Sequence, residues 1–177
     1  MQVRRAREGD DEAIARVYAP YVTHSAVSFE LVAPDSAEMR TRRTSGRPRL
    51  PWLVVEVEGA VAGFAYAAPF RARAAYQWSV EVSVYLAERA QRRGAGTALY
   101  EALLAELRGL GYVRAFAGIA LPNEGSVRLH EKLGFTPVGV YPSVGYKSGA
   151  WHDVGWWTVP LVDPRPVSPD PPREWRA

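Results

Sequence analysis

The 177-residue chain contains no cysteine and only two methionines. The absence of cysteine excludes disulfide bonds, thiolate zinc sites and every mechanism that uses a cysteine nucleophile. Only three histidines are present, His24, His130 and His152, and their spacing is not that of metal ligands. The sequence therefore predicts a protein that holds no metal.

Long hydrophobic runs are also absent. No apolar stretch approaches the length of a membrane span, and Met1-Gln2-Val3-Arg4-Arg5 is not followed by the apolar core of a signal peptide. These absences predict a soluble, cytoplasmic protein with no membrane partner.

Lysine is scarce, since 20 of the 22 basic residues are arginine, and the net charge is +3. Nucleic-acid binding is an alternative at this charge, but the arginines are scattered. The larger group (Arg40, Arg42, Arg43, Arg47 and Arg49) falls in one predicted helix and the loop after it. We therefore expect no nucleic-acid partner, and the modest positive charge favours an anionic small molecule instead.

The pattern of elements predicts one α/β domain over residues 1–160. Strands are predicted at 3–6, 52–57, 61–68, 80–86, 112–119, 136–146 and 152–160. Helices are predicted after a cap at Asp10 or Asp11, from about 34–35 to before Gly46, over 97–108, and from 122–123 to Gly134. This order favours a mixed sheet over a doubly wound parallel one. The proline-rich tail, 161–177, is expected to be extended and to lack a core of its own.

The segment from Val80 to Leu86 and the helix that follows it are the most informative part of the chain. Strict alternation predicts a strand, and Gln91-Arg92-Arg93-Gly94-Ala95-Gly96 then opens a helix. A helix start exposes unpaired amides and the positive end of the helix dipole to an anion. Glycines leave those amides accessible, so the segment predicts a pyrophosphate cradle.

These glycines have three other interpretations. A P-loop requires a lysine directly after its last glycine, and the nearest match, Gly145-Tyr146-Lys147-Ser148, has a tyrosine in between. A Rossmann fingerprint requires a third glycine where Leu99 stands. The remaining alternative is a helix start whose glycines serve only the geometry of the turn.

The Gln-x-x-Gly-x-Gly pattern after an alternating strand resembles the acyl-CoA signature of the GCN5-related N-acetyltransferases, the GNAT superfamily. A second segment, from Asn123 to Leu133-Gly134-Phe135, resembles the asparagine-led helix of the same superfamily. The resemblance implies the GNAT α/β fold, with a mixed, mostly antiparallel sheet of about seven strands flanked by about four helices. It also implies acetyl-CoA as the acetyl donor.

The chain further resembles one branch of that superfamily, the phosphinothricin N-acetyltransferases and their methionine sulfone or sulfoximine relatives. The resemblance covers nearly everything before the tail and is carried by 70–78, Glu81, 121–123, 126–131 and 151–157. It implies a homodimer that acetylates the α-amine of a small anionic amino acid or analogue. Because the chain has no cysteine, attack must be direct, in a ternary complex.

Two residues match catalytic positions of the family. Glu81 is expected to be the general base that takes the proton of the attacking amine, and the alternative is a solvent-facing position on a half-buried strand. His130 stands where many relatives carry a tyrosine. It is expected either to act as general acid or to bond the cofactor sulfur, and the alternative is a histidine that packs a helix.

The resemblance also assigns binding residues. The acetyl-CoA set is Val82, Val84, Gln91, Arg92, Arg93, Gly94, Ala95, Gly96, Thr97, Asn123 and Ser126. The acceptor set is Phe29, Arg71, Arg73 and Tyr76. Paired guanidinium groups suit a carboxylate or phosphinate, although the alternative is a solvated basic loop. Arg71 replaces the lysine that the phosphinothricin enzymes tend to carry, which puts the identity of the acceptor in question.

Two rival functions remain open. One is a protein or peptide N-terminal acetyltransferase of the same fold, which would require an open groove where the sequence predicts an arginine-lined loop. The other is a non-catalytic acyl-CoA-binding regulator, and the presence of Glu81 argues against it.

Overall fold

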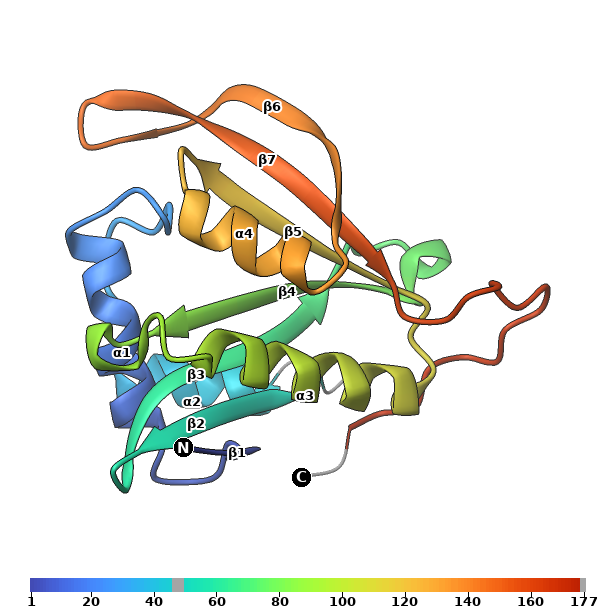
Figure 1. The fold of residues 1–177 in the computed structure, drawn as a ribbon, viewed down its shortest axis with the longest axis horizontal. Coiled ribbons are helices and arrows are strands. Elements are labelled where there is room, and N and C mark those ends of the chain that lie inside the picture. The colour runs from blue at the N-terminus through green and yellow to red at the C-terminus, as the bar shows by residue number, and fades with distance from the viewer. Residues whose placement is uncertain (46–49, 176–177) are drawn as a thin grey trace.

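A computed structural model describes residues 1–45 and 50–175 of the chain. Its centre is one seven-stranded sheet in the order β1-β2-β3-β4-β5-β7-β6 (Figure 1). The strands are β1 (Gln2–Arg5), β2 (Trp52–Val57), β3 (Ala60–Pro69), β4 (Ser79–Leu86), β5 (Arg114–Leu121), β6 (Thr136–Lys147) and β7 (Ala150–Pro160). Every neighbouring pair is antiparallel except β4 and β5, which are parallel. The predicted mixed, mostly antiparallel sheet is therefore confirmed.

Four α-helices cover the two faces of the sheet. They are α1 (Asp11–Thr23), α2 (Ser36–Ser45), α3 (Ala95–Leu110) and α4 (Glu124–Lys132), and two short 3-10 helices, η1 (Ala74–Tyr76) and η2 (Glu88–Ala90), flank β4. One buried cluster joins α3 and α4 to the face of Val80 and Val82, and a second joins α1 and α2 to the face of Phe64. Alternate strand residues point to opposite faces, so Glu81 lies on the α1–α2 side.

Both hairpin turns use left-handed backbone. Glu58 and Gly59 have φ values of 55° and 78° between β2 and β3, and Ser148 and Gly149 have 54° and 81° between β6 and β7. Positive φ at both central residues matches the twist of two-residue hairpins. The predicted turn at Glu58-Gly59 is thus confirmed.

Some predicted helix ends are wrong. Asp10 precedes α1 but its carboxylate does not cap the helix, because it accepts two hydrogen bonds from Arg4 and one from the Arg7 amide. Helix α3 begins at Ala95, two residues earlier than predicted. The predicted stop before Gly46, and Arg47 and Arg49 of the arginine group, lie outside the described residues.

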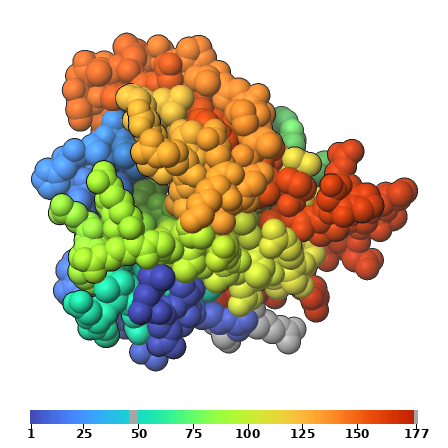
Figure 2. Space-filling model, in the orientation of Figure 1, coloured from blue at the N-terminus to red at the C-terminus, as the bar shows by residue number. Residues whose placement is uncertain are grey.

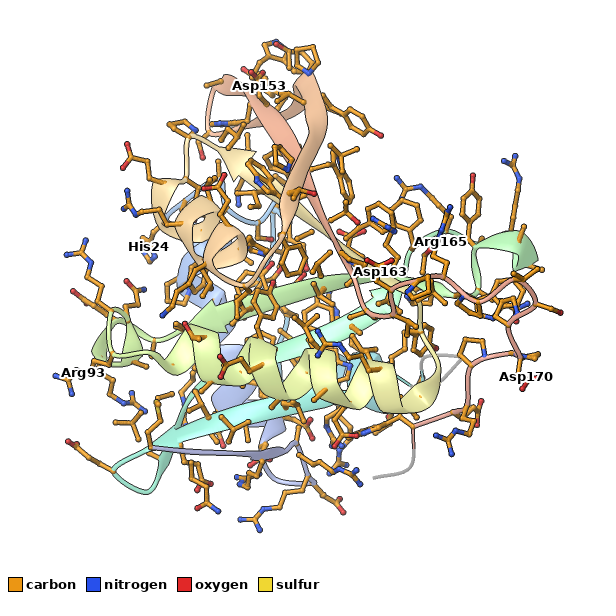
Figure 3. All side chains as sticks on the ribbon, turned by 45° about the vertical axis from the view of Figure 1, so that its right-hand side comes forward. His24, Arg93, Asp153, Asp163, Arg165 and Asp170 are labelled. Carbon is orange, nitrogen blue, oxygen red and sulfur yellow. The ribbon has the colours of Figure 1, made fainter. Side chains whose placement is uncertain are left out.

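The tail has neither helix nor strand over 161–175 and runs back across the molecule. The Arg173 amide donates to the Leu110 carbonyl at the end of α3, and Trp78 Nε1 donates to the Asp170 carbonyl. Trp175 is 6% exposed, although Asp170 itself projects at the edge of the molecule (Figure 3). The tail therefore buries two large side chains, Leu161 and Trp175, against the domain. None of the helices in the described ranges is long and apolar enough to cross a bilayer.

Candidate active site

Strands β4 and β5 pair only where they begin. The parallel ladder joins Ser79–Glu81 to Arg114–Phe116, and beyond it the two strands separate, as Figure 1 shows. Since β4 continues to Leu86 and β5 to Leu121, both strands leave one edge without a strand partner in the middle of the sheet.

The backbone of Val82 and Val84 faces this gap. The Ser79 carbonyl accepts from the Phe70 amide just after β3, and the Ala87 amide donates to the Ala62 carbonyl of β3, so odd-numbered residues of β4 direct their backbone groups that way. Even-numbered residues therefore direct theirs into the gap. There the Val82 carbonyl lies 3.4 Å from the hydroxyl of Tyr100. An extended ligand can add to this edge as a strand would.

The loop between β4 and α3 lies at the open end of the gap. Gly94 has a φ of 81° and no side chain caps the helix, so the first amides of α3 lack a side-chain partner. The predicted cradle residues all lie at this corner: Gln91, Arg92, Arg93, Gly94, Ala95, Gly96 and Thr97. Arg93 projects from the surface (Figure 3), and in Figure 2 the start of α3 and the orange α4 stand beside each other with a hollow between them.

The second glycine of the cradle has a packing reason. A Cβ on Gly96 would lie 3.0 Å from a methyl of Leu129 and 3.5 Å from a methyl of Leu86. Gly96 therefore lets α3 approach α4 and β4 closely, whereas a Cβ on Gly94 would meet only open space. The predicted access of an anion to the amides thus depends on Gly94 and its left-handed backbone.

Glu81 is the last residue of the β4–β5 ladder before the strands separate. Its cross-strand neighbours are Ala68 on β3 and Phe116 on β5. The side chain is half-buried, and this burial raises the pKa of Glu81, while the charge of Arg71 works in the opposite direction. A carboxylate with a raised pKa at the edge of a ligand gap is suited to accept a proton near neutral pH.

Arg71 is held close to this carboxylate by aromatic rings. Its guanidinium lies 4.3 Å from the ring centre of Phe70 and 5.6 Å from that of Trp156 on β7. It also donates to the Phe70 carbonyl at 2.6 Å. The arginine is therefore positioned by cation–π contacts and not by a carboxylate partner, which leaves its charge available to an anion.

The structure separates the four predicted acceptor residues into two places. Arg71, Arg73 and Tyr76 line one depression of 540 Å³ beside the start of β4. Phe29 lies elsewhere, in the segment between α1 and α2, with its ring against Gly145 and 6.1 Å from the ring of His152. The depression also reaches Val80 and Tyr112 of the buried cluster that joins α3, so it is not confined to the α1–α2 side, where the Glu81 side chain lies.

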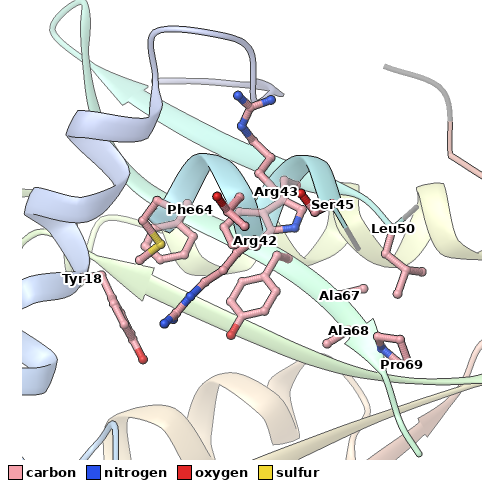
Figure 4. A pocket seen from close by; sticks show the side chains of 13 residues that line it. Tyr18, Arg42, Arg43, Ser45, Leu50, Phe64, Ala67, Ala68 and Pro69 are labelled. Atoms are coloured by element: carbon pink, nitrogen blue, oxygen red, sulfur yellow. The ribbon is translucent and has the colours of Figure 1, made fainter. Parts of the chain in front are cut away.

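A pocket that the sequence did not predict adjoins Glu81. It has a volume of 440 Å³ between α2 and the sheet (Figure 4), and its wall includes Ala68, the cross-strand neighbour of Glu81. Four aromatic side chains line it: Tyr18, Trp52, Phe64 and Tyr66. Trp52, Phe64 and Tyr66 are stacked. Alternate aromatic residues on β3 were the available signal, but their pocket exists only because α2 packs across them.

His130 on α4 is enclosed and fully bonded. It is 2% exposed, its Nδ1 lies 2.7 Å from the Ser126 carbonyl, and its Nε2 lies 3.0 Å from the hydroxyl of Tyr100. A carbonyl only accepts, so Nδ1 carries the proton and Nε2 of the neutral ring accepts from Tyr100. Burial lowers the pKa of His130, which favours this neutral form. These contacts favour the packing role among the alternatives that the sequence left open.

Asn123 and Ser126 lie at the start of α4. The Asn123 side-chain oxygen accepts from the Ser126 amide at 3.1 Å, so Asn123 is the N-cap of α4. Within the described ranges, no three histidine, aspartate or glutamate side chains gather closely enough to hold a metal ion.

Comparison with known families identifies this architecture. The model of the "Acetyltransferase (GNAT) family" matches residues 19–135, which include the whole gap, the cradle and α4. The chain belongs to the acetyltransferase (GNAT) family.

Individual relatives cover nearly the whole of this acetyltransferase. A phosphinothricin N-acetyltransferase of Streptomyces viridochromogenes is 43% identical over 96% of this chain and 94% of its own. An L-methionine sulfoximine/L-methionine sulfone acetyltransferase of Salmonella typhimurium is 34% identical over 91% of this chain and 95% of its own. The crystal structure of a phosphinothricin acetyltransferase from Sinorhizobium meliloti, in complex with AcCoA, is 33% identical with a TM-score of 0.90, covering 96% of this chain and 92% of that one.

Proposed function

We propose that this enzyme transfers acetyl from acetyl-CoA to the α-amine of a small anionic amino acid or analogue. Phosphinothricin, methionine sulfone and methionine sulfoximine are the acceptors that the relatives' names suggest. The observation that carries the proposal is Glu81, a half-buried carboxylate with a raised pKa where β4 and β5 part, within electrostatic reach of Arg71.

The proposed acetyl-CoA site is formed by backbone groups more than by side chains. We propose that Val82 and Val84 pair with the extended arm of acetyl-CoA and that the loop from Gln91 to Thr97 holds its pyrophosphate, with Arg92 and Arg93 adding charge. Asn123 and Ser126 would flank the same ligand from α4. When bound, acetyl-CoA supplies the thioester carbon that the amine attacks.

Glu81 is proposed as the general base. An α-amine is protonated near pH 7 and only its neutral form attacks, so a carboxylate must accept the proton directly or through one water. The burial that raises the pKa of Glu81 brings its basicity closer to the working pH. No cysteine is available for an acetyl-enzyme intermediate, so the amine attacks the thioester directly.

The acceptor is proposed to lie on the α1–α2 side of β4. Arg71, assisted by Arg73 and Tyr76, binds its anionic group, and Phe29 bounds the site from the opposite side. The aromatic pocket under α2 offers room for an apolar part of the acceptor next to Ala68. For His130, a general-acid role would require the ring to exchange its bond to Tyr100 for one to the leaving sulfur.

A homodimer is also proposed, through the edge strand β6. Large apolar side chains are exposed along it: Val138 59%, Val140 51%, Tyr141 50%, Val144 52% and Tyr146 60%. Exposed apolar edges favour association with another chain, and contiguous patches of this kind mark interfaces. Light scattering after size exclusion should give twice the chain mass, and Val140→Glu should give the monomer. A monomeric wild-type protein would contradict this part of the proposal.

We also propose that residues 1–160 form the catalytic domain and that the tail is an appended strap. Every residue assigned above to donor or acceptor binding precedes residue 161. Hydrogen bonds and ring contacts join the tail to α3, to Arg5 of β1, to Trp78 and to Val113, away from the β4–β5 gap.

The test is the release of CoA thiol by the purified protein with acetyl-CoA and a panel of acceptors. The panel contains phosphinothricin, methionine sulfone, methionine sulfoximine, ordinary amino acids and a short peptide. Turnover confined to the first three supports the proposal. Turnover with the peptide alone would favour the N-terminal acetyltransferase alternative, and tight acetyl-CoA binding without any turnover would favour the regulator.

A further inference from the structure

Lys147 is an unusual residue in this chain. It is one of only two lysines beside 20 arginines, it ends strand β6, and it is 6% exposed. Lysine is rarely buried unless its ammonium group is bonded, because removing the charge from water costs several kcal/mol. The residue belongs to the Gly145-Tyr146-Lys147-Ser148 segment, which has no part in the donor site.

The partners of Lys147 lie far away in the sequence. Its Nζ donates to the carbonyl of Val22 at 2.6 Å and to the carbonyl of Ser28 at 2.5 Å. Val22 lies in the last turn of α1, where carbonyls lack helical partners and carry the negative end of the helix dipole. The ammonium group thus joins the tip of the β6–β7 hairpin to the end of α1 and to the segment that follows it.

That segment is also held from its other side. The Ser28 hydroxyl lies 2.7 Å from the hydroxyl of Tyr18, which donates to Glu30 at 2.8 Å. Arg42 of α2 makes a two-pronged ion pair with Glu30 at 2.7 and 2.9 Å. Residues 28–30 are therefore fixed between the helices on one side and Lys147 on the other.

Phe29 lies at the centre of this arrangement. A Cβ on Gly145 would lie 2.3 Å from the Phe29 ring, so the ring occupies the space that only a glycine on β6 leaves. The hairpin that Lys147 anchors carries Gly145 and His152 against this ring, and Trp156 against Arg71. Both sides of the proposed acceptor site thus depend on where the hairpin tip is held.

We propose that Lys147 is a positioning residue for the acceptor, latching the β6–β7 hairpin to residues 28–30 so that Phe29 bounds the acceptor site. The inference rests on the proposed function. The latch reaches neither α3 nor the loop before it, so its loss should weaken acceptor use and leave acetyl-CoA binding unchanged. A guanidinium is broader than an ammonium group and does not converge on two carbonyls at these distances, so arginine should not replace it.

The experiment compares Lys147→Met and Lys147→Arg with Lys132→Met, which removes the other, exposed lysine. We expect kcat/KM for the acceptor to fall by about tenfold to a hundredfold in both Lys147 variants, since small misplacements cost that much. The acetyl-CoA dissociation constant should stay within about twofold, and Lys132→Met should match the wild type. Unchanged acceptor kinetics, or equal losses for donor and acceptor, would overturn the proposal.

Two further measurements keep the test decisive. If Lys147→Met does not fold, Gly145→Ala displaces the Phe29 ring directly and should reproduce the selective loss for the acceptor. Amide exchange over residues 24–30 needs no turnover and should accelerate in Lys147→Arg. If the wild type acetylates nothing while this exchange accelerates, the proposed function fails and the latch stands. Unchanged amide exchange would show that Lys147 does not hold residues 24–30 in place.

Discussion

Replacing Glu81 by glutamine should separate catalysis from folding in this enzyme. Glutamine keeps the size and shape of the side chain but accepts no proton from the amine. General bases contribute about 10²- to 10⁴-fold, so kcat should fall by that factor, which corresponds to about 2.7–5.4 kcal/mol on the activation barrier. The lower end is expected if a water or hydroxide ion replaces the carboxylate at high pH.

The same substitution should not destabilise the protein. Burial raises the pKa of Glu81 above its value in the unfolded chain, so the folded state holds the proton to higher pH. Between the unfolded value and the raised folded value, the contribution of this carboxyl to the free energy of unfolding falls as pH rises. Glutamine carries no ionisable proton, so the variant does not lose this part of its stability as pH rises. Glu81→Gln should therefore melt at the same or a higher temperature than the wild type above neutral pH, and the difference should shrink toward pH 4.

The assay is thiol release measured from pH 6 to 9 together with calorimetric melting of the same preparations. Glu101→Gln, at an exposed position on α3, is the matched control and should change neither quantity. A kcat within twofold of the wild type would refute the role of Glu81 as base. A fall in kcat that accompanies an equal fall in melting temperature would instead show that the side chain serves the fold.

Three other substitutions test separate parts of the structure. Gly94→Ala forces a Cβ onto left-handed backbone, so it should cost about 1–2 kcal/mol and weaken acetyl-CoA binding in a titration without raising the KM of the acceptor. His130→Phe removes the two hydrogen bonds of the buried ring, to the Tyr100 hydroxyl and the Ser126 carbonyl, so the free energy of unfolding measured in urea should fall by about 1–3 kcal/mol while kcat changes less than tenfold; a hundredfold fall in kcat would establish the general acid. Trp175→Ala should lower stability by about 3 kcal/mol and leave turnover intact, and loss of activity would contradict the view of the tail as a strap.

Local sequence signals predicted most of the fold. Strand β2 has the predicted ends, because the mostly apolar run from Trp52 to Val57 stops at a two-residue turn of Glu58 and Gly59. The helix after Asn123 was also predicted, since an asparagine cap and a glycine at Gly134 mark its two ends. These features depend on neighbours within four residues, which is the range over which periodicity and capping act.

The parts that the sequence could not give depend on contacts between distant segments. Lys147 bonds to carbonyls 119 and 125 residues away, and no periodic pattern marks such a pair. Aspartate is a residue type that often caps helices, yet the Asp10 carboxylate accepts its hydrogen bonds from Arg4 of β1 instead. Gly96 was predicted to leave room for an anion, whereas the nearest atoms to its missing Cβ belong to Leu129. In each case a tertiary partner replaces the local one.

The separation of β4 from β5 also affects the stability of the protein when no ligand is bound. Without a ligand, the middle of the sheet has two facing edges where much of the backbone has no strand partner, so this is where local opening and proteolytic attack should begin. A donor that lies between the strands completes the sheet. At a hundred times its dissociation constant, such a ligand adds about 2.7 kcal/mol to the cost of unfolding. The lifetime of the enzyme is thereby linked to the supply of its own acetyl donor.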